Sequence, residues 1–357
     1  MPSNNIAIVA ASAFTPYGMT TDDFIEGING RPVQFDNNSE LAEYISEASV
    51  QVALTPEYDA RKVLNARGIN HLDRLTRHVC VAAQQLHASL VDDGMDQWPV
   101  QIAADRLSIV LGTTGPVQSV VDFDMAAIEE PQYVSSGLFP NIVFNVPACY
   151  ASIRHGAKAS VISFNDGETA SANAFKTAIG QLQNNRADMV WVGGAEALTP
   201  AHVLLIGSQS NYQAGQPLPA MTEGAYLLAA VKYDMAVQNA MPVLAELECA
   251  VSLFCPDPEK ALVALLARMC AERPVEMQEI SWLVGETSGV DGILGYALKT
   301  LDIQQPLGYL ASATTAASVM TVLCHRQVLA GERVLHICRD ENGAWAAVLL
   351  RKNRDLC

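Results

Sequence analysis

Glu168 has the clearest setting for chemistry in this chain. Residues 160–164 form a short apolar run that includes β-branched residues, and residues 165–167 form a turn. Small and apolar residues then recur at helical spacing over 168–182. The free backbone amides at a helix N-terminus favour negative charge. The pattern therefore predicts a buried strand, a sharp turn and a helix that carries Glu168 in its first turn.

Two roles are open for the Glu168 carboxylate. Asn165 lies three residues earlier, so the pair fits a capping box, in which each side chain bonds a backbone amide at the other residue. A carboxylate in the first turn of a helix contributes about 0.3–1 kcal/mol to stability without any further function. The alternative role is that of a catalytic base. We expect the capping role.

A second strand follows this helix and ends in a glycine-rich motif. Residues 189–192 are apolar and lead into Gly-Gly-Ala-Glu at 193–196. The strand, the turn, the helix and this motif together resemble the nucleophile elbow of the β-ketoacyl synthases, members of the thiolase superfamily. In that family a Cys opens the helix, and an ungapped count from the motif places it at Glu168. The resemblance implies the five-layered α-β-α-β-α thiolase fold, an α/β fold of two similar halves, with an elbow that lacks its nucleophile.

The matching motifs of the second half have also lost their catalytic side chains. The family's His-Gly-Thr-x-Thr strand end corresponds to 284–288, which places Gly285 at the histidine. A later Lys and a later His of the family correspond to Gln304 and Tyr309. Decarboxylative condensation needs a thiolate to carry the acyl group and imidazoles to stabilise the enolate and the oxyanion. The resemblance therefore implies no condensing activity, with degenerate positions at Glu168, Gly285, Gln304 and Tyr309.

Dimerisation and a chain tunnel are further features that the resemblance implies. The family's elbow strands pair across the dimer axis, which here places apolar side chains at an interface: Val161, Ile162 and Phe164. Large apolar side chains are core residues by default, and this applies to Met125, Phe139 and Phe144. The resemblance instead places their segments near the dimer interface and the acyl tunnel. Both interpretations stay open.

Three functions are compatible with these losses. The favoured one is a non-catalytic subunit resembling the chain length factors, which pair with an active ketosynthase and shape its chain tunnel in type II polyketide, polyene or fatty-acid-like biosynthesis. The second is a decarboxylase that primes chains from malonyl thioesters, although the loss of both histidines weighs against it. The third is a structural or regulatory dimer without a chain pocket.

Composition limits the partners. The chain has 357 residues and a formal net charge of −16. So negative a chain is poorly suited to bind nucleic acid or an anionic membrane surface. Acyl carrier proteins are acidic as well, so we expect a carrier protein to dock mainly on the active ketosynthase partner.

Cysteine and histidine positions indicate neither a metal site nor a disulfide framework. The eight cysteines and seven histidines are scattered, without a CxxC pair. Free thiols are typical of a reducing compartment, so we expect a cytoplasmic protein with no metal and no cofactor. The first residues lack the pattern of a signal peptide. The apolar run over 310–323 is shorter than the roughly 20 residues that cross a bilayer.

Strand and helix patterns alternate twice along the chain, which predicts two α/β halves at 1–234 and 235–357. In the second half the pattern predicts helices over 290–301 and 310–329. Residues 32–70 are weakly patterned, and we assign them no function.

Overall fold

The structure is a computed structural model that describes residues 5–91, 102–134, 136–209, 212, 215–286, 290–294 and 297–356. Within these residues ten strands form one large sheet and three short strands form a second one. The first half contributes β1 (Ile6–Phe14), β4 (Leu107–Gly112), β5 (Val161–Phe164), β6 (Met189–Glu196) and β8 (Gly224–Lys232). The second half contributes β9 (Ala245–Phe254), β10 (Ile280–Gly285), β11 (Lys299–Leu301), β12 (Arg333–Arg339) and β13 (Ala344–Lys352).

The two halves repeat one strand topology. The order along the large sheet is β11-β10-β12-β13-β9-β1-β8-β6-β4-β5. If the strands are numbered in chain order within each half, both halves follow the order 3-2-4-5-1. A short antiparallel contact between β1 and β9, with Ile6 opposite Leu247, joins them. The repetition agrees with two α/β halves, and the boundary at residue 234 stays a prediction.

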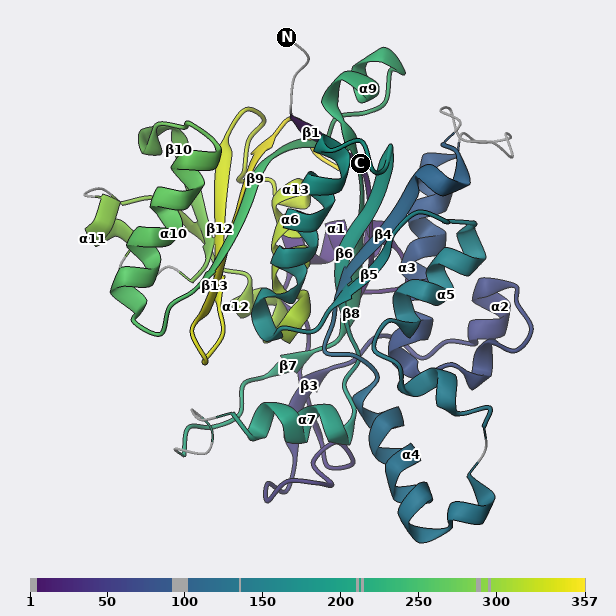
Figure 1. The fold of residues 1–357 in the computed structure, drawn as a ribbon. Coiled ribbons are helices and arrows are strands. Elements are labelled where there is room, and N and C mark those ends of the chain that lie inside the picture. Colours follow the sequence, from purple (N-terminus) through teal and green to yellow (C-terminus); the bar gives the residue numbers. More distant parts are fainter. Residues whose placement is uncertain are drawn as a thin grey trace.

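Helices form three layers around the two half-sheets. The helices α6 (Ala170–Gln183) and α13 (Thr314–Cys324) share one apolar core with side chains of β1 and β13. The outer helices α3 (Arg74–Leu90) and α5 (Val146–His155) cover the first half, and α10 (Pro258–Glu272) covers the second. Figure 1 shows this succession from α10, through β12 and β13, the α6–α13 pair and β6, to α3 and α5. The predicted five-layered thiolase fold is confirmed.

Residues along β1 alternate between two of these layers, as strand geometry requires. Ile6 and Ile8 pack into the central core with α6 and α13, whereas Ala7 and Val9 pack outward against α3. Apolar side chains therefore occupy both faces of the strand. This explains why the sequence of β1 is apolar throughout rather than alternating.

The central helices approach the strands closely because the contact residues are small. A Cβ added at Gly194 would lie 2.9 Å from the Ala313 Cα, and one at Gly112 would lie 2.2 Å from the Ser171 amide nitrogen. Every residue of α13 is buried. The glycine motif at 193–196 therefore brings β6 against the start of α13.

The stretch 32–70 covers one end of the first half. It contains β2 (Asp36–Asn38) and β3 (Val50–Ala53), which form the second sheet with β7 (Met221–Thr222), and it continues into α2 (Ala60–Leu64). Its apolar side chains pack with those of α7 (Pro200–Gly207) in a separate cluster, and Tyr309 packs against that cluster. This stretch therefore supports α7 and one wall of the candidate site.

The helix α4 (Val117–Glu129) forms an arm, which the turns η3 (Pro131–Tyr133) and η4 (Phe139–Ile142) continue. No residue of α4 is buried, although the helix contacts η4 and α7. Figure 1 shows α4 and α7 together at the lower end of the molecule.

Two predicted helices of the second half are wrong in extent. The helix predicted over 290–301 is observed only as α11 (Val290–Leu294). Residues 299–301 instead form the strand β11, because Lys299 pairs in parallel with Trp282 of β10. The helix predicted over 310–329 is observed only as α13, which begins at Thr314 and ends at Cys324. It is shorter because the backbone of Ala311 is left-handed (φ 43°) and that of His325 is extended. The other helices described are α1 (Thr21–Gly30), α9 (Tyr233–Gln238) and α12 (Gln304–Leu307).

Candidate functional site

A pocket of about 810 Å³ brings together all four degenerate positions. Glu168, Gly285, Gln304 and Tyr309 line it, although they are up to 141 residues apart in the chain. Glu168 follows β5 and Gly285 ends β10. Gln304 opens α12, and Tyr309 follows the turn after that helix. The structure therefore assembles the site at which the family would place its nucleophile, its lysine and its two histidines.

Glu168 does not cap a helix, so the predicted capping box is wrong. The chain makes a 3₁₀ turn, η5 (Gly167–Thr169), before α6 begins, and no side chain caps the helix at its Thr169 N-cap. Asn165 donates its amide to the Thr114 carbonyl oxygen instead, at 3.2 Å. The Glu168 Oε1 accepts a hydrogen bond from the Tyr309 hydroxyl at 3.1 Å. This carboxylate is therefore half-buried and faces the pocket.

Carboxylates dominate the charge of the pocket. Among the described residues, five acidic side chains line it: Glu168, Glu286, Asp302, Asp340 and Glu341. The one cation among these described lining residues is Arg339, which pairs with Glu286 at 3.0 Å and lies 5.4 Å from the Trp345 ring. Burial raises the pKa of Glu168 to about 7. The hydrogen bond from Tyr309 lowers this pKa, but the nearby Asp340 charge raises it further. The pocket is therefore an unfavourable place for a further anion.

The raised pKa of Glu168 makes stability depend on pH. Native Glu168 holds its proton up to about pH 7, whereas the unfolded side chain ionises near pH 4.5. The folded state therefore loses stability as the pH rises from about 4.5 to 7. Glu168→Gln removes this loss. We therefore expect the difference in the free energy of unfolding between the variant and the wild type to shift by about 1–3 kcal/mol in favour of the variant from pH 4.5 to pH 8. Urea unfolding midpoints across this range measure it.

Glu259→Gln is the matched control for that titration, because Glu259 is exposed on α10 and is not one of the residues that line the pocket. We expect its unfolding midpoints to follow those of the wild type at every pH. If the Glu168→Gln curve also ran parallel to the wild type, the raised pKa of the half-buried Glu168 carboxyl would be excluded.

Gly285 cannot be replaced by a histidine without rearranging the backbone. Its φ is +90°, a left-handed conformation that side chains disfavour. A Cβ at this position would lie 2.2 Å from the Ile337 carbonyl oxygen of the neighbouring strand β12. Residues 287 and 288, the last two of the matched motif, lie outside the described residues. The backbone itself therefore excludes an imidazole at Gly285.

Cys338 lies in the lining of the pocket, and its position was not predicted. Its Sγ is 3.5 Å from the Thr315 hydroxyl, which in turn lies 3.0 Å from Nε2 of His336. Burial raises the pKa of the Cys338 thiol to about 12 and lowers the pKa of His336 to about 3. Both groups are uncharged near neutral pH, so this pair does not provide the thiolate that acyl transfer requires.

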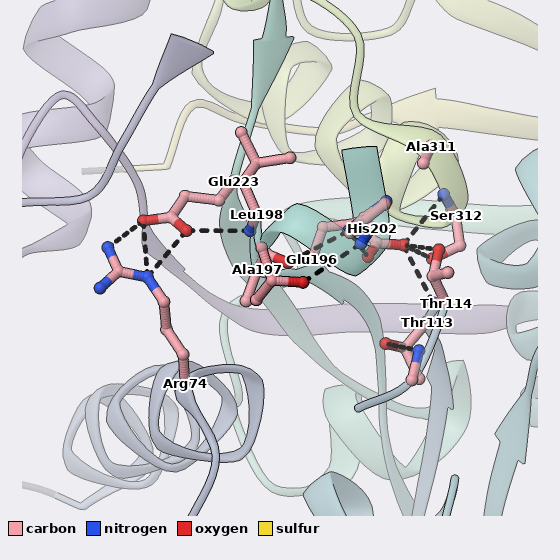
Figure 2. A network of polar contacts seen from close by, with 12 residues as sticks. Arg74, Thr113, Thr114, Glu196, Ala197, Leu198, His202, Glu223, Ala311 and Ser312 are labelled. Carbon is pink, nitrogen blue, oxygen red and sulfur yellow. Dashed lines mark hydrogen bonds and ion pairs between the residues drawn. The ribbon is translucent and has the colours of Figure 1, made fainter. Parts of the chain in front are cut away.

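The Gly-Gly-Ala-Glu motif ends in a buried carboxylate that joins three segments. Glu196 Oε1 accepts hydrogen bonds from the Thr114 amide at 3.0 Å and its hydroxyl at 2.6 Å, and from the amide and hydroxyl of Ser312. Its other oxygen lies 3.5 Å from Nδ1 of the buried His202. Figure 2 shows these groups converging on Glu196. The motif therefore ties β6 to the loop after β4 and to the start of α13.

A second buried carboxylate, Glu223, anchors the end of α3. Arg74 donates to it through Nε at 2.9 Å and also through a terminal guanidinium nitrogen, and the Leu198 amide donates to its other side (Figure 2). The amide and hydroxyl of Thr55 complete its bonds. The Glu223 side chain is fully buried. Burial opposes its ionisation, but His78 and Arg74 outweigh that effect and hold its pKa below the usual value. Both carboxylates are therefore structural and lie outside the pocket lining.

Met125, Phe139 and Phe144 lie on the surface of this chain. The sequence leaves two positions open for them, the core or the neighbourhood of the tunnel. Met125, Phe139 and Phe144 are 47%, 56% and 45% exposed, so the default assignment to the core is wrong. None of them lines the pocket that contains Glu168. Phe144 lies against Gly115, where an added Cβ would come within 2.2 Å of its ring. The alternative, an interface or tunnel role, stays a prediction.

The elbow strand β5 is the last strand at one end of the sheet. Its residues are all half-buried; Val161 packs toward α3 and α5, whereas Ile162 and Phe164 pack toward the central core. Among the described residues, only β4 pairs with this strand. An apolar strand with one free edge can accept a further strand. The predicted interface role of these side chains therefore stays open.

The described ranges contain no cluster of three or more His, Cys, Asp or Glu side chains that could hold a metal ion. A helix long and apolar enough to cross a membrane is also missing from this part of the chain.

Sequence comparisons give a family match. A family model described as "Beta-ketoacyl synthase, N-terminal domain" matches residues 3–223. The 3-oxoacyl-[acyl-carrier-protein] synthase 2 of Synechocystis sp. is 23% identical over 271 residues, which are 71% of this chain and 60% of that protein. The match thus spans less than two thirds of the relative's length.

Solved structures share the fold over nearly the whole chain. One described as the ishigamide ketosynthase/chain length factor has a TM-score of 0.82 at 23% identity, covering 98% of this chain and 99% of that one. A β-ketoacyl synthase from Burkholderia phymatum gives 0.80 at 13% identity, covering 98% and 100%. A ketosynthase in complex with its chain length factor from Xenorhabdus doucetiae gives 0.74 at 13%, covering 98% of both chains. At these identities the likeness concerns the fold.

Proposed function

Because the chain belongs to the β-ketoacyl synthase family, we propose that it is a non-condensing subunit similar to a chain length factor. In this role it pairs with an active ketosynthase and shapes the tunnel in which that partner extends an acyl or polyketide chain. The pathway would be of the type II polyketide, polyene or fatty-acid-like kind. The chain would act in the cytoplasm, where its free cysteines stay reduced.

The content of the pocket carries this proposal. A thiolate nucleophile and two imidazoles are required for condensation. The corresponding positions hold a carboxyl at Glu168, a hydrogen at Gly285 and a phenol at Tyr309. The Glu168 carboxyl is a poor acyl carrier, and the Gly285 backbone excludes a side chain. Several changes together, one of them built into the backbone, support a subunit that has lost the chemistry and kept the fold.

The charge of the pocket argues against the decarboxylase alternative. A malonyl thioester brings a free carboxylate to the site. The lining offers five carboxylic side chains and one guanidinium, and the latter is already paired with Glu286. Like charges this close repel one another, more strongly in a partly buried site than in water. A priming reaction on malonyl groups is therefore disfavoured.

The free edge of β5 supports pairing with a second chain of the same fold. Val161, Ile162 and Phe164 are apolar and half-buried in the isolated chain. Strand addition at such an edge would bury their exposed parts and satisfy the unpaired backbone groups. The active ketosynthase would also provide the main docking surface for an acyl carrier protein, because this chain carries a net charge of −16.

Co-expression with an intact ketosynthase of the same genome tests the proposal. We expect a 1:1 complex by native mass spectrometry, and condensing activity in the complex but not in this chain alone. We expect Glu168→Ala to leave the activity of the complex within about twofold, because no step of condensation uses the Glu168 carboxylate. The readout is the rate of carrier-bound product formation.

Each failure of this experiment has a distinct meaning. A homodimer of this chain recovered beside unbound ketosynthase supports the structural or regulatory alternative. Complete loss of activity in a Glu168→Ala complex that still assembles would show that the carboxylate takes part in the reaction. Condensing activity of the purified chain alone would overturn the proposal.

A further inference from the structure

The pocket that contains Glu168 already holds one cation of the chain itself. Nε of Arg339 lies 3.0 Å from the Glu286 carboxylate, and its guanidinium carbon lies 5.4 Å from the centre of the Trp345 ring. A carboxylate together with an aromatic ring is a combination that attracts organic cations. In this part of the pocket the carboxylate therefore has its counter-ion.

The part of the pocket around Glu168 contains the same two kinds of group without a cation. Tyr212 and Tyr309 line it beside Glu168, and the Tyr309 hydroxyl donates to Oε1 of the carboxyl at 3.1 Å. Within the described part of the chain, Oε2 accepts no hydrogen bond and the carboxyl forms no ion pair. The residues outside the described ranges include no Lys, Arg or His in sequence. No side chain of this protein therefore neutralises Glu168.

A proton takes the place of the missing counter-ion. Burial raises the pKa of Glu168 to about 7. The Asp340 charge adds to this rise, whereas the Arg339 charge opposes it. The titratable groups that face Glu168 from the surrounding elements are Tyr212, Glu286, Tyr309, Cys338, Arg339 and Asp340. A carboxyl that is half protonated near pH 7 beside an open cavity can exchange its proton for a cation.

The size of the cavity suits an organic cation. Its volume of about 810 Å³ lies within the range of small-molecule sites, roughly 300–1,000 Å³. The described residues offer no group of three ligands for a metal ion. The carboxylates of Asp302 and Glu341 line the same cavity and are exposed, so they attract a cation from solution.

We infer that this pocket binds a small organic amine, whose ammonium group bonds the free oxygen of Glu168 and lies against the rings of Tyr212 and Tyr309. The carboxylate contributes a charge-assisted hydrogen bond, and the rings contribute cation–π attraction. Every group that carries this binding belongs to this chain, so the amine binds whether or not a ketosynthase is present. The pocket that lacks the groups for condensation thus serves as a ligand site.

Binding of the amine should release the Glu168 proton, because an ammonium group favours the ionised carboxylate. Below about pH 7 the amine must displace that proton, and above it the carboxylate is already free. From pH 8 to pH 6 the dissociation constant should therefore rise about tenfold. The amine itself stays charged over this range, because the pKa of an aliphatic amine is about 10.4.

Calorimetric titration of the full chain with hexamethylenediamine at pH 6, 7 and 8, in 150 mM NaCl, tests the inference. Hexamethylene glycol is the neutral probe of the same length, and MgCl2 is the inorganic cation. Glu168→Gln removes the charge and keeps the shape, whereas Tyr212→Leu removes a ring and keeps the charge. Glu26→Gln is the matched control, because Glu26 is exposed on α1 and does not line the pocket.

We expect one diamine to bind per chain, about tenfold more tightly at pH 8 than at pH 6, and the glycol not to bind. Glu168→Gln should weaken binding at pH 8 by about tenfold or more and remove the pH dependence. Tyr212→Leu should weaken it by about threefold or more and keep that dependence. Glu26→Gln and 5 mM MgCl2 should each change the dissociation constant less than about twofold.

Four results would show the inference to be wrong. The diamine might fail to bind the wild type at pH 8, or bind Glu168→Gln as tightly and with the same pH dependence. Equal weakening by Glu26→Gln would assign the binding to the net charge of −16 rather than to the pocket. Displacement of the diamine by MgCl2 would assign the pocket to an inorganic cation. A chain that binds the diamine but no ketosynthase would support the inference and contradict the proposed function.

Discussion

Arg74→Met should destabilise the chain by about 3 kcal/mol or more, because it leaves the Glu223 carboxylate buried without its cation. The Glu223 side chain is fully buried and accepts hydrogen bonds from two guanidinium nitrogens of Arg74. Thr55 and the Leu198 amide remain as partners, but neither carries a charge. For a chain of this length we expect the melting temperature to fall by roughly 4 °C or more, measured by differential scanning calorimetry.

Arg77→Met is the matched control for this prediction. Arg77 lies one turn further along α3, is half-buried, and donates to the Asp73 carbonyl oxygen at 3.4 Å. The carboxylate that Arg77 stabilises, Asp73, is only half-buried and is also bonded by the amide and hydroxyl of Thr76, so we expect a loss below about 1 kcal/mol. The double variant Arg74→Met/Glu223→Gln should recover part of the stability, because it also removes the buried charge. Equal losses for both arginines would show that the ion pair does not anchor α3.

The fold was predictable because its signals are local. Apolar strands at 160–164 and 189–192, small residues at helical spacing between them, and the glycines at 193 and 194 each follow from backbone geometry. A Cβ at Gly194 would lie 2.9 Å from the Ala313 Cα, so the packing of this motif requires a glycine there. The family resemblance then supplied the order of the layers, which the strand topology confirms.

The details of the candidate site depend on contacts between distant segments, and these were not predictable. Tyr309 bonds Glu168 across 141 positions, so the capping box, a purely local prediction, was wrong. The five carboxylates of the pocket come from segments spread over 168–341, and the sequence contains no sign that they converge. The left-handed backbone of Gly285 is likewise set by β12, its neighbouring strand.

The surface of the arm was misjudged for a different reason. A large apolar side chain is assigned to the core of its own chain by default, but it can equally be buried by a partner. Met125, Phe139 and Phe144 have helical or turn neighbours with polar residues between them, which is the pattern of an ordinary surface element. Only the exposed fractions in the folded chain distinguish the two cases.

In the proposed complex the arm contributes to the length of the product. If the partner's tunnel crosses the interface, side chains of this chain form its far wall, and the segment around Phe144 is the candidate. Phe144 is 45% exposed and lies against Gly115, so its ring has a defined position and a free face. Each methylene of a bound chain gains about 0.8 kcal/mol on burial, which corresponds to roughly a fourfold change in occupancy.

Phe144→Ala should therefore shift the products of the complex toward longer chains, because it enlarges the space beyond the last methylene that fits. Met125→Trp should act in the opposite sense and shorten them. The first condensations should proceed at the wild-type rate in both cases, since the partner's catalytic residues are untouched. Mass spectrometry of the released products measures the distribution, and Phe254→Ala, at an exposed phenylalanine of the other half, is the control. If both arm substitutions left the distribution unchanged in an assembled complex, the arm would not form the tunnel wall and this chain would serve only as a scaffold.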